Sequence, residues 1–280
     1  MKMTSKFQAE EDYFQEESNL TDWRPKKRLG QNFLIDIAMA MNVASAIDLK
    51  GLKILEIGAG SGQITQYLCE YAKKGKVTAL EIDKQLVEEL KKKFGKNKNL
   101  LIKDTDALKF DFNGYDAIFG NLPYYISTPI LFKILESDCK SAVLMVQEEF
   151  GKRLVATKGD SDFSRLTVSI QSVFQTEIID YVPAESFDPA PKVASVVVKL
   201  LRKPENQQVK INSKLLRMAF CHKNKTLLNS LLSSRKELKK NREEIRNIAQ
   251  KHLSEWKDVK IRQLSLEDWS NISKKYPLTS

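Results

Sequence analysis

The hydrophobic and polar positions of residues 53–148 alternate between short apolar runs and longer stretches with helical spacing. The apolar runs are rich in Ile, Leu and Val, which is typical of buried strands, whereas the stretches between them place apolar residues three or four apart. Strands that alternate with helices at this rhythm predict a parallel sheet with helices on both faces. We expect strands at 53–58, 76–83, 99–104, 115–121 and 141–148, and helices at 62–74, 84–95 and 128–137.

Two further β-branched runs, 176–182 and 193–201, follow each other without a helical stretch between them. Neighbouring strands without a crossover helix predict an antiparallel pair that finishes the sheet. The predicted fold is therefore α/β and Rossmann-like, with a mostly parallel seven-stranded sheet that contains one antiparallel strand.

The remainder of the chain follows a polar, Pro-containing linker at 202–208 and has a helical pattern, with a final helix at 266–276. We predict three parts: an acidic extension at 1–23 that is poorly ordered or loosely helical, an α/β domain at 24–203, and a small all-α domain at 204–280.

Charge is unevenly distributed along the 280 residues, whose net charge is +10. Residues 7–23 contain six acidic residues and no Lys or Arg, whereas residues 214–240 contain eight Lys or Arg and the single acid Glu237. A basic cluster beside a catalytic domain favours a polyanionic partner, such as nucleic acid.

Other features narrow the class of protein. No apolar run approaches the roughly 18 residues that span a bilayer, and the N-terminus lacks the apolar stretch of a signal peptide, so we expect a cytoplasmic protein that does not insert in membranes. The three cysteines, Cys69, Cys139 and Cys221, are scattered and are expected to be reduced thiols. With only two histidines, neither a His-based catalytic triad nor a metal site is expected.

The loop EIGAGSG ends the first strand and opens the first helix. Its glycines, Gly58, Gly60 and Gly62, allow a tight turn and a close approach of a ligand to the backbone, although a glycine triplet alone also fits a structural turn. Glu81 lies 21 residues after Gly60 at the end of the next strand, where a carboxylate accepts hydrogen bonds from both ribose hydroxyls of a nucleoside cofactor.

The same loop indicates which cofactor is bound. Gln63 stands where the dinucleotide fingerprint has its last glycine, and no basic residue is present to meet a pyrophosphate. Glu56 beside the loop would repel phosphates but suits the sulfonium and ammonium groups of S-adenosylmethionine. Asp106, after the third strand, is placed to accept a hydrogen bond from the cofactor's adenine amine. Each acid alone fits a solvated strand end, but three in succession predict S-adenosylmethionine.

The segment NLPYY, residues 121–125, predicts the transfer chemistry. The exocyclic amine of adenine is a poor nucleophile because its lone pair is delocalised into the ring. The Asn121 side-chain oxygen and the Leu122 carbonyl could accept both N–H groups and favour a tetrahedral nitrogen. Tyr124 could stack on the base, which must be extruded from its own stack to reach this site. The plainer interpretation is a proline turn with a buried tyrosine.

With these motifs, the chain resembles the ribosomal RNA adenine N6-dimethyltransferase family (KsgA type) from about residue 24 to the C-terminus. EIGAGSG, LEID, DAL and NLPYYIS match successive family motifs, and KKRLGQNFL resembles the N-terminal cofactor motif. The resemblance implies that Phe187, in FDPAPKVASVVV, sandwiches the adenine against Tyr124, and that AFCHKNKTLLNSL contacts RNA. The implied cofactor contacts are Gln31, Asn32, Leu34, Glu56, Gly58, Ala59, Gly60, Glu81, Ile82, Asp106, Ala107 and Asn121, and the implied RNA contacts are Lys223, Lys225 and Asn229.

Two features depart from the family pattern. Tyr125 stands where the family often has Asn, and the acidic 1–23 extension is not part of the pattern. One hypothesis is that this extension folds over the basic surface as a mimic of RNA; the other is a plain tail.

The predicted function is S-adenosylmethionine-dependent N6,N6-dimethylation of two adjacent adenosines near the 3′ end of small-subunit rRNA, by a monomer that acts on RNA or on the immature small subunit. The first alternative is an antibiotic-resistance methylase of large-subunit rRNA, which shares the catalytic motifs. A second is a ribosome-assembly checkpoint or transcription factor with a vestigial site. The intact site residues argue against this alternative: Asn121, Tyr124, Glu81 and Asp106. A DNA adenine or protein glutamine methylase would more typically carry NPPY.

Overall fold

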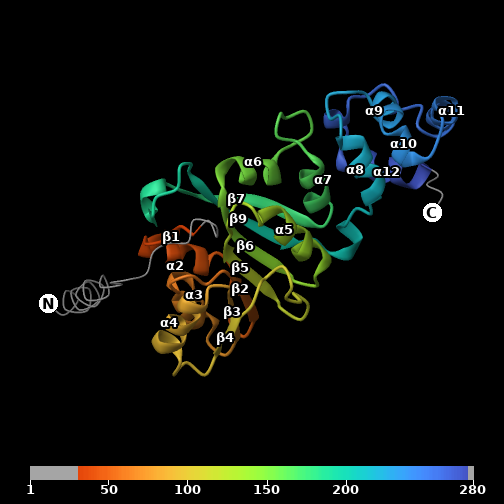
Figure 1. The fold of residues 1–280 in the computed structure, drawn as a ribbon. Helices are drawn as coiled ribbons and strands as arrows, with labels where there is room; N and C mark the ends of the chain where they lie inside the picture. Colours follow the sequence, from red (N-terminus) through yellow and green to blue (C-terminus); the bar gives the residue numbers. More distant parts are fainter. Residues whose placement is uncertain (1–30, 277–280) are drawn as a thin grey trace.

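The computed structural model describes residues 31–276, and its central feature is a seven-stranded sheet (Figure 1). The strand order is β4-β3-β2-β5-β6-β9-β7. Every strand points the same way except β9, which is antiparallel to both of its neighbours, so the predicted sheet with one antiparallel strand is confirmed. The strands are β2 (Lys53–Ile57), β3 (Lys76–Glu81), β4 (Leu100–Asp104), β5 (Ala117–Asn121), β6 (Ser141–Gln147), β7 (Phe174–Val182) and β9 (Ser195–Arg202).

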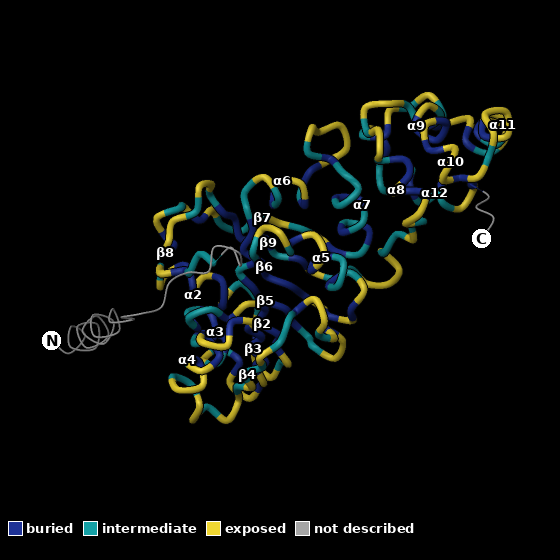
Figure 2. The backbone as a smooth tube through the Cα atoms, in the orientation of Figure 1, coloured by how far each residue is buried: buried dark blue, intermediate teal, exposed yellow. Residues whose placement is uncertain are grey.

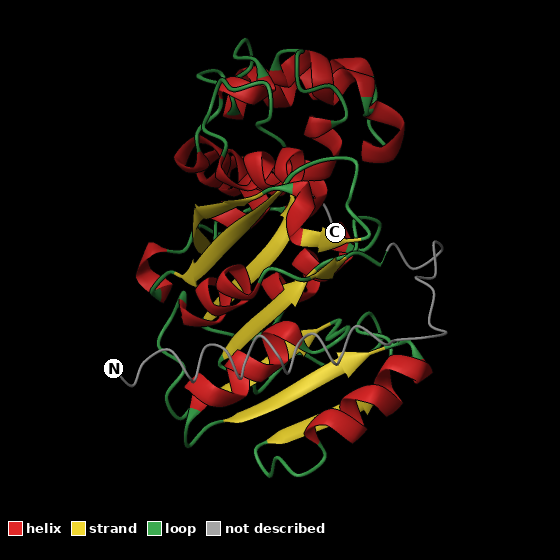
Figure 3. Ribbon diagram, turned by 90° about the vertical axis from the view of Figure 1, so that its left-hand side faces the viewer, coloured by secondary structure: helices red, strands yellow, loops and turns green. Residues whose placement is uncertain are grey.

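Helices cover both faces of this sheet (Figure 3). Ile54 of β2 joins a core formed with α2 and α3, whereas its neighbour Leu55 joins a core formed with α5 and α7. Because both faces are covered, the central strands are buried along most of their length (Figure 2), which explains their continuous apolar sequences. One face carries α2 (Ile37–Ser45), α3 (Gln63–Ala72) and α4 (Lys84–Phe94), and the other carries α5 (Ser127–Glu136), α6 (Glu148–Val155) and α7 (Arg165–Gln171).

A separate two-stranded sheet joins the start of the described chain to a segment just before β9. In it β1 (Phe33–Leu34) pairs antiparallel with β8 (Phe187–Asp188). Asp36 follows β1, caps α2 by accepting the backbone N–H of Met39, and also accepts the Ser186 hydroxyl at 3.0 Å. This pairing holds Gln31 and Asn32 at the carboxyl edge of the main sheet.

The C-terminal part is helical, as predicted, and lies at one end of the sheet (Figure 1). Its core surrounds Trp269, which is fully buried and lies 5.5 Å from Phe220 between ring centroids. Three residues from around α6 and α7 complete this core: Ala156, Phe163 and Val168. The helices are α8 (Ser213–Phe220), α9 (Leu227–Ser233), α10 (Arg235–Leu238), α11 (Arg242–His252) and α12 (Leu266–Lys275).

The segment between α6 and α7 is tied to these helices by two hydrogen bonds. The Gly159 N–H donates to the Arg262 carbonyl at 2.7 Å, and Lys223 Nζ donates to the Ser161 carbonyl at 2.6 Å. The helical part is therefore packed and hydrogen-bonded against the α/β part, and the division at residues 203 and 204 stays a prediction. The acidic 1–23 extension lies outside the described residues.

Candidate active site

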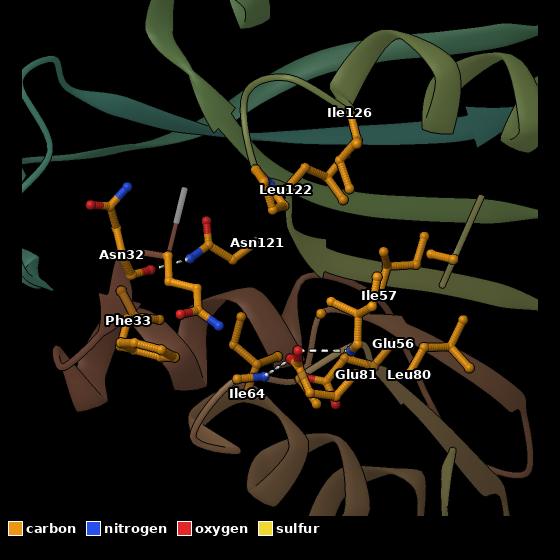
Figure 4. A pocket seen from close by; sticks show the side chains of 18 of the residues that line it. Asn32, Phe33, Glu56, Ile57, Ile64, Leu80, Glu81, Asn121, Leu122 and Ile126 are labelled. Atoms are coloured by element: carbon orange, nitrogen blue, oxygen red, sulfur yellow. Dashed lines mark hydrogen bonds between the residues drawn. The ribbon is translucent and has the colours of Figure 1, made fainter. Parts of the chain in front are cut away.

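A cavity of about 270 Å³ opens at the carboxyl ends of β2, β3 and β5 (Figure 4). It is lined by the segment before and within β1, by the glycine loop, by the ends of β3 and β5, and by residues 105–108. Open α/β sheets bind ligands at this edge. Every residue predicted to bind cofactor or adenine lines this one cavity: Gln31, Asn32, Leu34, Glu56, Gly58, Ala59, Gly60, Glu81, Ile82, Asp106, Ala107, Asn121, Leu122, Tyr124 and Phe187.

The three glycines of the loop have different functions. All of them have positive φ angles, of 70°, 57° and 84° for Gly58, Gly60 and Gly62, which side-chain-bearing residues rarely adopt. A Cβ atom at Gly62 would lie 2.5 Å from the Phe94 ring, so this glycine is also needed for the packing of α3 against α4. Gly58 and Gly60 instead line the cavity, where they leave room for a ligand beside the backbone.

Glu81, at the end of β3, is held by backbone N–H groups. Its Oε2 accepts from Gly60 at 2.9 Å, and its Oε1 accepts from Ile82 at 2.8 Å and Asp83 at 2.9 Å. Burial raises the pKa of Glu81, and these three hydrogen bonds oppose that rise. A carboxylate offers about four acceptor positions, so capacity remains for a ligand hydroxyl group.

Glu56, at the end of β2, is the most deeply buried acid of the cavity. It is 2% exposed, and Thr65 Oγ1 donates to its Oε2 at 2.6 Å. Burial, assisted by the nearby Glu81 charge, raises the pKa of Glu56 to about 8. No Lys, Arg or His is among the described residues that line the cavity, so the site fits a cationic ligand and offers no cation to a phosphate.

Asp106 follows β4 and lines the same cavity. Its Oδ1 accepts the Leu108 N–H at 2.9 Å, which fixes the side chain at the start of a turn. Thr105, just before it, donates its N–H to the Glu81 carbonyl, so the two acids are held on neighbouring strands. Three carboxyl groups thus line one cavity from the ends of β2, β3 and β4, and this arrangement fits S-adenosylmethionine.

Asn121 ends β5, and its amide has a fixed orientation (Figure 4). The Nδ2 group donates to the Asn32 carbonyl at 3.0 Å. Because a carbonyl oxygen only accepts, the amide nitrogen must face Asn32, and Oδ1 points to the other side. The next residue, Leu122, is held by its N–H, which donates to the Met145 carbonyl at 3.0 Å. The turn that follows is closed on the Pro123 carbonyl by the Ile126 N–H at 3.1 Å.

Three of the aromatic rings that line the cavity differ clearly in exposure. Tyr124 is 37% exposed and Tyr125 is 59% exposed, whereas Phe187 is 4% exposed. Phe187 belongs to the core beneath β1 as well as to the cavity lining. Its predicted stacking on an adenine opposite Tyr124 stays a prediction.

The predicted RNA contacts lie in the helical part, away from the cavity lining. Lys223 is half-buried and donates to the Ser161 carbonyl, whereas Lys225 is exposed and donates to Ser233 Oγ at 3.0 Å. Asn229 is exposed on α9. Their contact with RNA stays a prediction.

The structure also adds residues that the sequence motifs did not single out. Phe33 lines the cavity, and a Cβ atom on Gly60 would lie 3.2 Å from its ring. Thr65, which donates to Glu56, lies in the first turn of α3, nine residues after the acid. This spacing in the sequence could have indicated that the two side chains meet. Within residues 31–276, no group of three or more His, Cys, Asp or Glu could hold a metal ion. No helix of that region is long and apolar enough to cross a membrane.

The sheet order, the glycine loop and the three acids define a Rossmann-like class I methyltransferase. Residues 23–275 match the family model described as ribosomal RNA adenine dimethylase. The chain therefore belongs to the ribosomal RNA adenine dimethylase family, whose members use S-adenosylmethionine.

Relatives and solved structures agree with this assignment. The chain is 40% identical, over 231 residues, to a probable ribosomal RNA small subunit methyltransferase A of Methanopyrus kandleri, with 80% of this chain and 82% of the relative covered. It is 36% identical to the protein of that name from Thermococcus sibiricus, with 89% of this chain and 91% of the relative covered. A dimethyladenosine transferase from Plasmodium falciparum superimposes with a TM-score of 0.72 at 29% identity, covering 87% and 98%. The 23S rRNA methyltransferase ErmE superimposes with a TM-score of 0.64 at 25% sequence identity, with 88% of this chain and 99% of ErmE covered.

Proposed function

We propose that this enzyme transfers methyl groups from S-adenosylmethionine to N6 of two adjacent adenosines near the 3′ end of small-subunit rRNA, twice at each base. Family membership and the names of the archaeal relatives support this substrate. The observation that carries the proposal is the fixed amide of Asn121, which directs Oδ1 away from Asn32 as a hydrogen-bond acceptor.

The cavity residues would hold the cofactor along its length. When bound, S-adenosylmethionine supplies an electrophilic methyl group on its sulfonium sulfur. Gln31, Asn32 and Leu34 would contact the methionine part. The ammonium group would favour the ionised form of Glu56, whose pKa burial raises to about 8 without a ligand. Glu81 Oε2 would accept from a ribose hydroxyl group and Asp106 from the adenine amine, with backbone contributions from the loop and from residues 82 and 107. No lysine or arginine competes for these acids within the described lining.

The adenine would be oriented by the residues that follow β5. In the first transfer, Asn121 Oδ1 and the Leu122 carbonyl would accept the two N6 hydrogens and localise the nitrogen lone pair, and in the second they would share the one hydrogen that remains. Each transfer would release S-adenosylhomocysteine and one N6 proton, which passes to water. Tyr124, half-exposed at the cavity, stacks on the base, with Phe187 as the opposing ring. Neither residue removes a proton from the substrate before attack, which is consistent with the absence of histidine from the described lining.

The finer aspects of the function follow from the same proposal. We expect a cytoplasmic monomer that contributes to biogenesis of the small subunit and requires no metal. The basic helical part, with Lys223, Lys225 and Asn229, would contact rRNA of the immature subunit, because lysines neutralise phosphates without regard to sequence.

Primer extension on rRNA tests the proposal. The purified protein and S-adenosylmethionine are incubated with small subunits that lack the modification, with naked small-subunit rRNA, and with large subunits. N6,N6-dimethyladenosine cannot form a Watson–Crick pair, so we expect two adjacent stops near the 3′ end of small-subunit rRNA. Stops confined to large-subunit rRNA would instead support the activity named for ErmE, and no stops on any RNA would refute the proposal.

A further inference from the structure

Tyr125 has no part in the chemistry proposed above, and folding does not explain it. Its side chain is 59% exposed at the mouth of the cavity, between the Asn121 acceptor and α5. An aromatic ring left in water contributes little burial energy, because hydrophobic stabilisation is proportional to the apolar area removed from water. Exposed rings beside a nucleic-acid site are typical stacking platforms.

The backbone under Tyr125 is fixed. Leu122 donates its N–H to Met145, and the Pro123 carbonyl accepts from both the Ile126 N–H and, at 3.2 Å, the Ser127 hydroxyl. The turn therefore holds the ring on an element anchored to β6 and α5. A ring with a fixed base loses less conformational freedom when it stacks on a ligand.

Tyr124 and Tyr125 are successive residues of this turn and differ in exposure, 37% against 59%. Successive residues in a helix-like turn do not face each other, so one base cannot stack on both rings. If Tyr124 stacks on the adenine in the pocket, Tyr125 is available to a different base.

We propose that Tyr125 stacks on the nucleobase next to the extruded adenine and so holds the second target adenosine at the cavity mouth. This inference rests on the proposed function, because that function places two targets next to each other in the RNA. The chemical class of the ligand is a purine base of a single-stranded segment. The consequence is that the RNA stays bound between modification of the first and of the second adenosine.

The test is a single-encounter methylation assay. Enzyme is preincubated with unmodified small subunits, and S-adenosylmethionine is then added together with an excess of competitor subunits whose rRNA carries a distinguishing mass label. Mass spectrometry of the nuclease fragment that spans both adenosines gives the ratio of RNA modified at both adenosines to RNA modified at one of them. Base stacking is worth about 1–3 kcal/mol, so Tyr125→Ala should lower this ratio at least about fivefold.

Two variants serve as matched controls. Tyr125→Phe keeps the ring and should keep the wild-type ratio. Tyr181→Ala removes a ring of nearly equal exposure, 58%, from β7 outside the cavity lining, and should also leave the ratio within about twofold. An unchanged ratio in Tyr125→Ala, or an equal fall in Tyr181→Ala, would overturn the inference. Both alanine variants should melt close to the wild type, since both side chains are exposed.

A binding measurement without cofactor separates this inference from the proposed function. The probe is small-subunit rRNA that carries the fluorescent base 2-aminopurine in place of the second adenosine. Binding of the wild type or of Tyr125→Phe should quench the 2-aminopurine fluorescence, whereas binding of Tyr125→Ala should not. If the wild type methylates no adenosine and this pattern is still seen, the proposed function fails and the stacking role stands. Equal quenching by all three proteins refutes the stacking role.

Discussion

The cavity and the basic helical part both carry ionisable residues, but the surroundings of these residues are opposite. In the cavity, Glu81 is 5% exposed and accepts three backbone N–H groups, and Glu56 is 2% exposed and accepts the Thr65 hydroxyl. In the helical part, Lys225 is exposed and its side chain donates to the Ser233 hydroxyl. A buried charge depends on each partner, whereas an exposed one is screened by water and salt.

This difference determines how substitutions should act. In the cavity, one replaced side chain leaves buried partners unpaired and has a large, local effect. On the basic surface, each lysine adds a small, salt-dependent increment to polyanion binding.

Asn121→Ala should lower kcat for methyl transfer by about 10²–10³-fold, because removal of one oriented hydrogen-bonding group from a reacting centre costs that much. Cofactor affinity should stay nearly intact. Single-turnover methylation and calorimetry measure the two effects. The control is Asn42→Ala, on the exposed side of α2. A rate near that of the wild type would refute the acceptor role of Asn121.

Glu81→Ala should weaken S-adenosylmethionine binding by about 10–150-fold, since a hydrogen bond to a charged group is worth about 1.5–3 kcal/mol. The loss also leaves the Gly60, Ile82 and Asp83 N–H groups without their carboxylate. Calorimetry gives the Kd. Glu177→Ala, which removes an exposed carboxylate paired with Lys199 at 3.1 Å, should change the Kd less than twofold. An unchanged Kd in Glu81→Ala would remove this residue from the ribose site.

Glu56→Gln should change the pH dependence of stability. Burial raises the pKa of Glu56 from 4.5 to about 8 in the folded protein, so between these values the folded state binds one proton more than the unfolded state. This contribution is present below about pH 4.5 and is lost as the pH rises to about 8. Across this range, the free energy of unfolding of Glu56→Gln relative to the wild type should rise by up to about 1.4 kcal/mol per pH unit.

Denaturant titrations at several pH values measure this difference. Glu149→Gln is the control, because its carboxylate is largely exposed on α6 and should show no such trend. A difference between Glu56→Gln and the wild type that does not vary with pH would mean that Glu56 titrates near its ordinary pKa.

Reversal of both lysines, Lys223→Glu with Lys225→Glu, should weaken rRNA binding by about 3–10-fold and reduce the salt slope by about 1.5, as expected for two lost phosphate contacts. The control is reversal of Lys96 and Lys98, which are exposed in the α4–β4 loop. Binding at several salt concentrations gives both quantities. Because Lys223 also donates to Ser161, a melting curve must accompany the titration. A slope equal to that of the control would place the RNA surface elsewhere.

The same contrast explains which features could be predicted from the sequence. The buried strands and their order of appearance follow from apolar periodicity, and NLPYY and the glycine loop occur at strand ends, so their residues meet at one edge of the sheet. The short helices α6 and α7 have apolar faces of only a few residues and were not predicted. The β1–β8 pairing could not be predicted from local sequence patterns, because its strands are two residues long and lie far apart in sequence.

Side-chain partners were the least predictable feature. Nothing in the sequence near Phe187 shows that its ring is 4% exposed, since that burial arises from the core beneath β1. Likewise, the bond from Lys223 to the Ser161 carbonyl depends on how the helical part packs on the α6–α7 segment. Such contacts are set by tertiary packing, which a charge count does not contain.

The β1–β8 pairing also sets the order in which the enzyme becomes competent. The Ser186–Asp36 hydrogen bond joins residues 150 positions apart, and such contacts form late because loop-closure entropy opposes them. A nascent chain that has folded only as far as β6 already contains Glu81, Asp106 and Asn121. It also contains Asn32, but it lacks the β8 partner that pairs with β1 and so holds the Asn32 carbonyl beside the Asn121 amide. We therefore expect the wall that completes the cavity to form only after β8 has been synthesised.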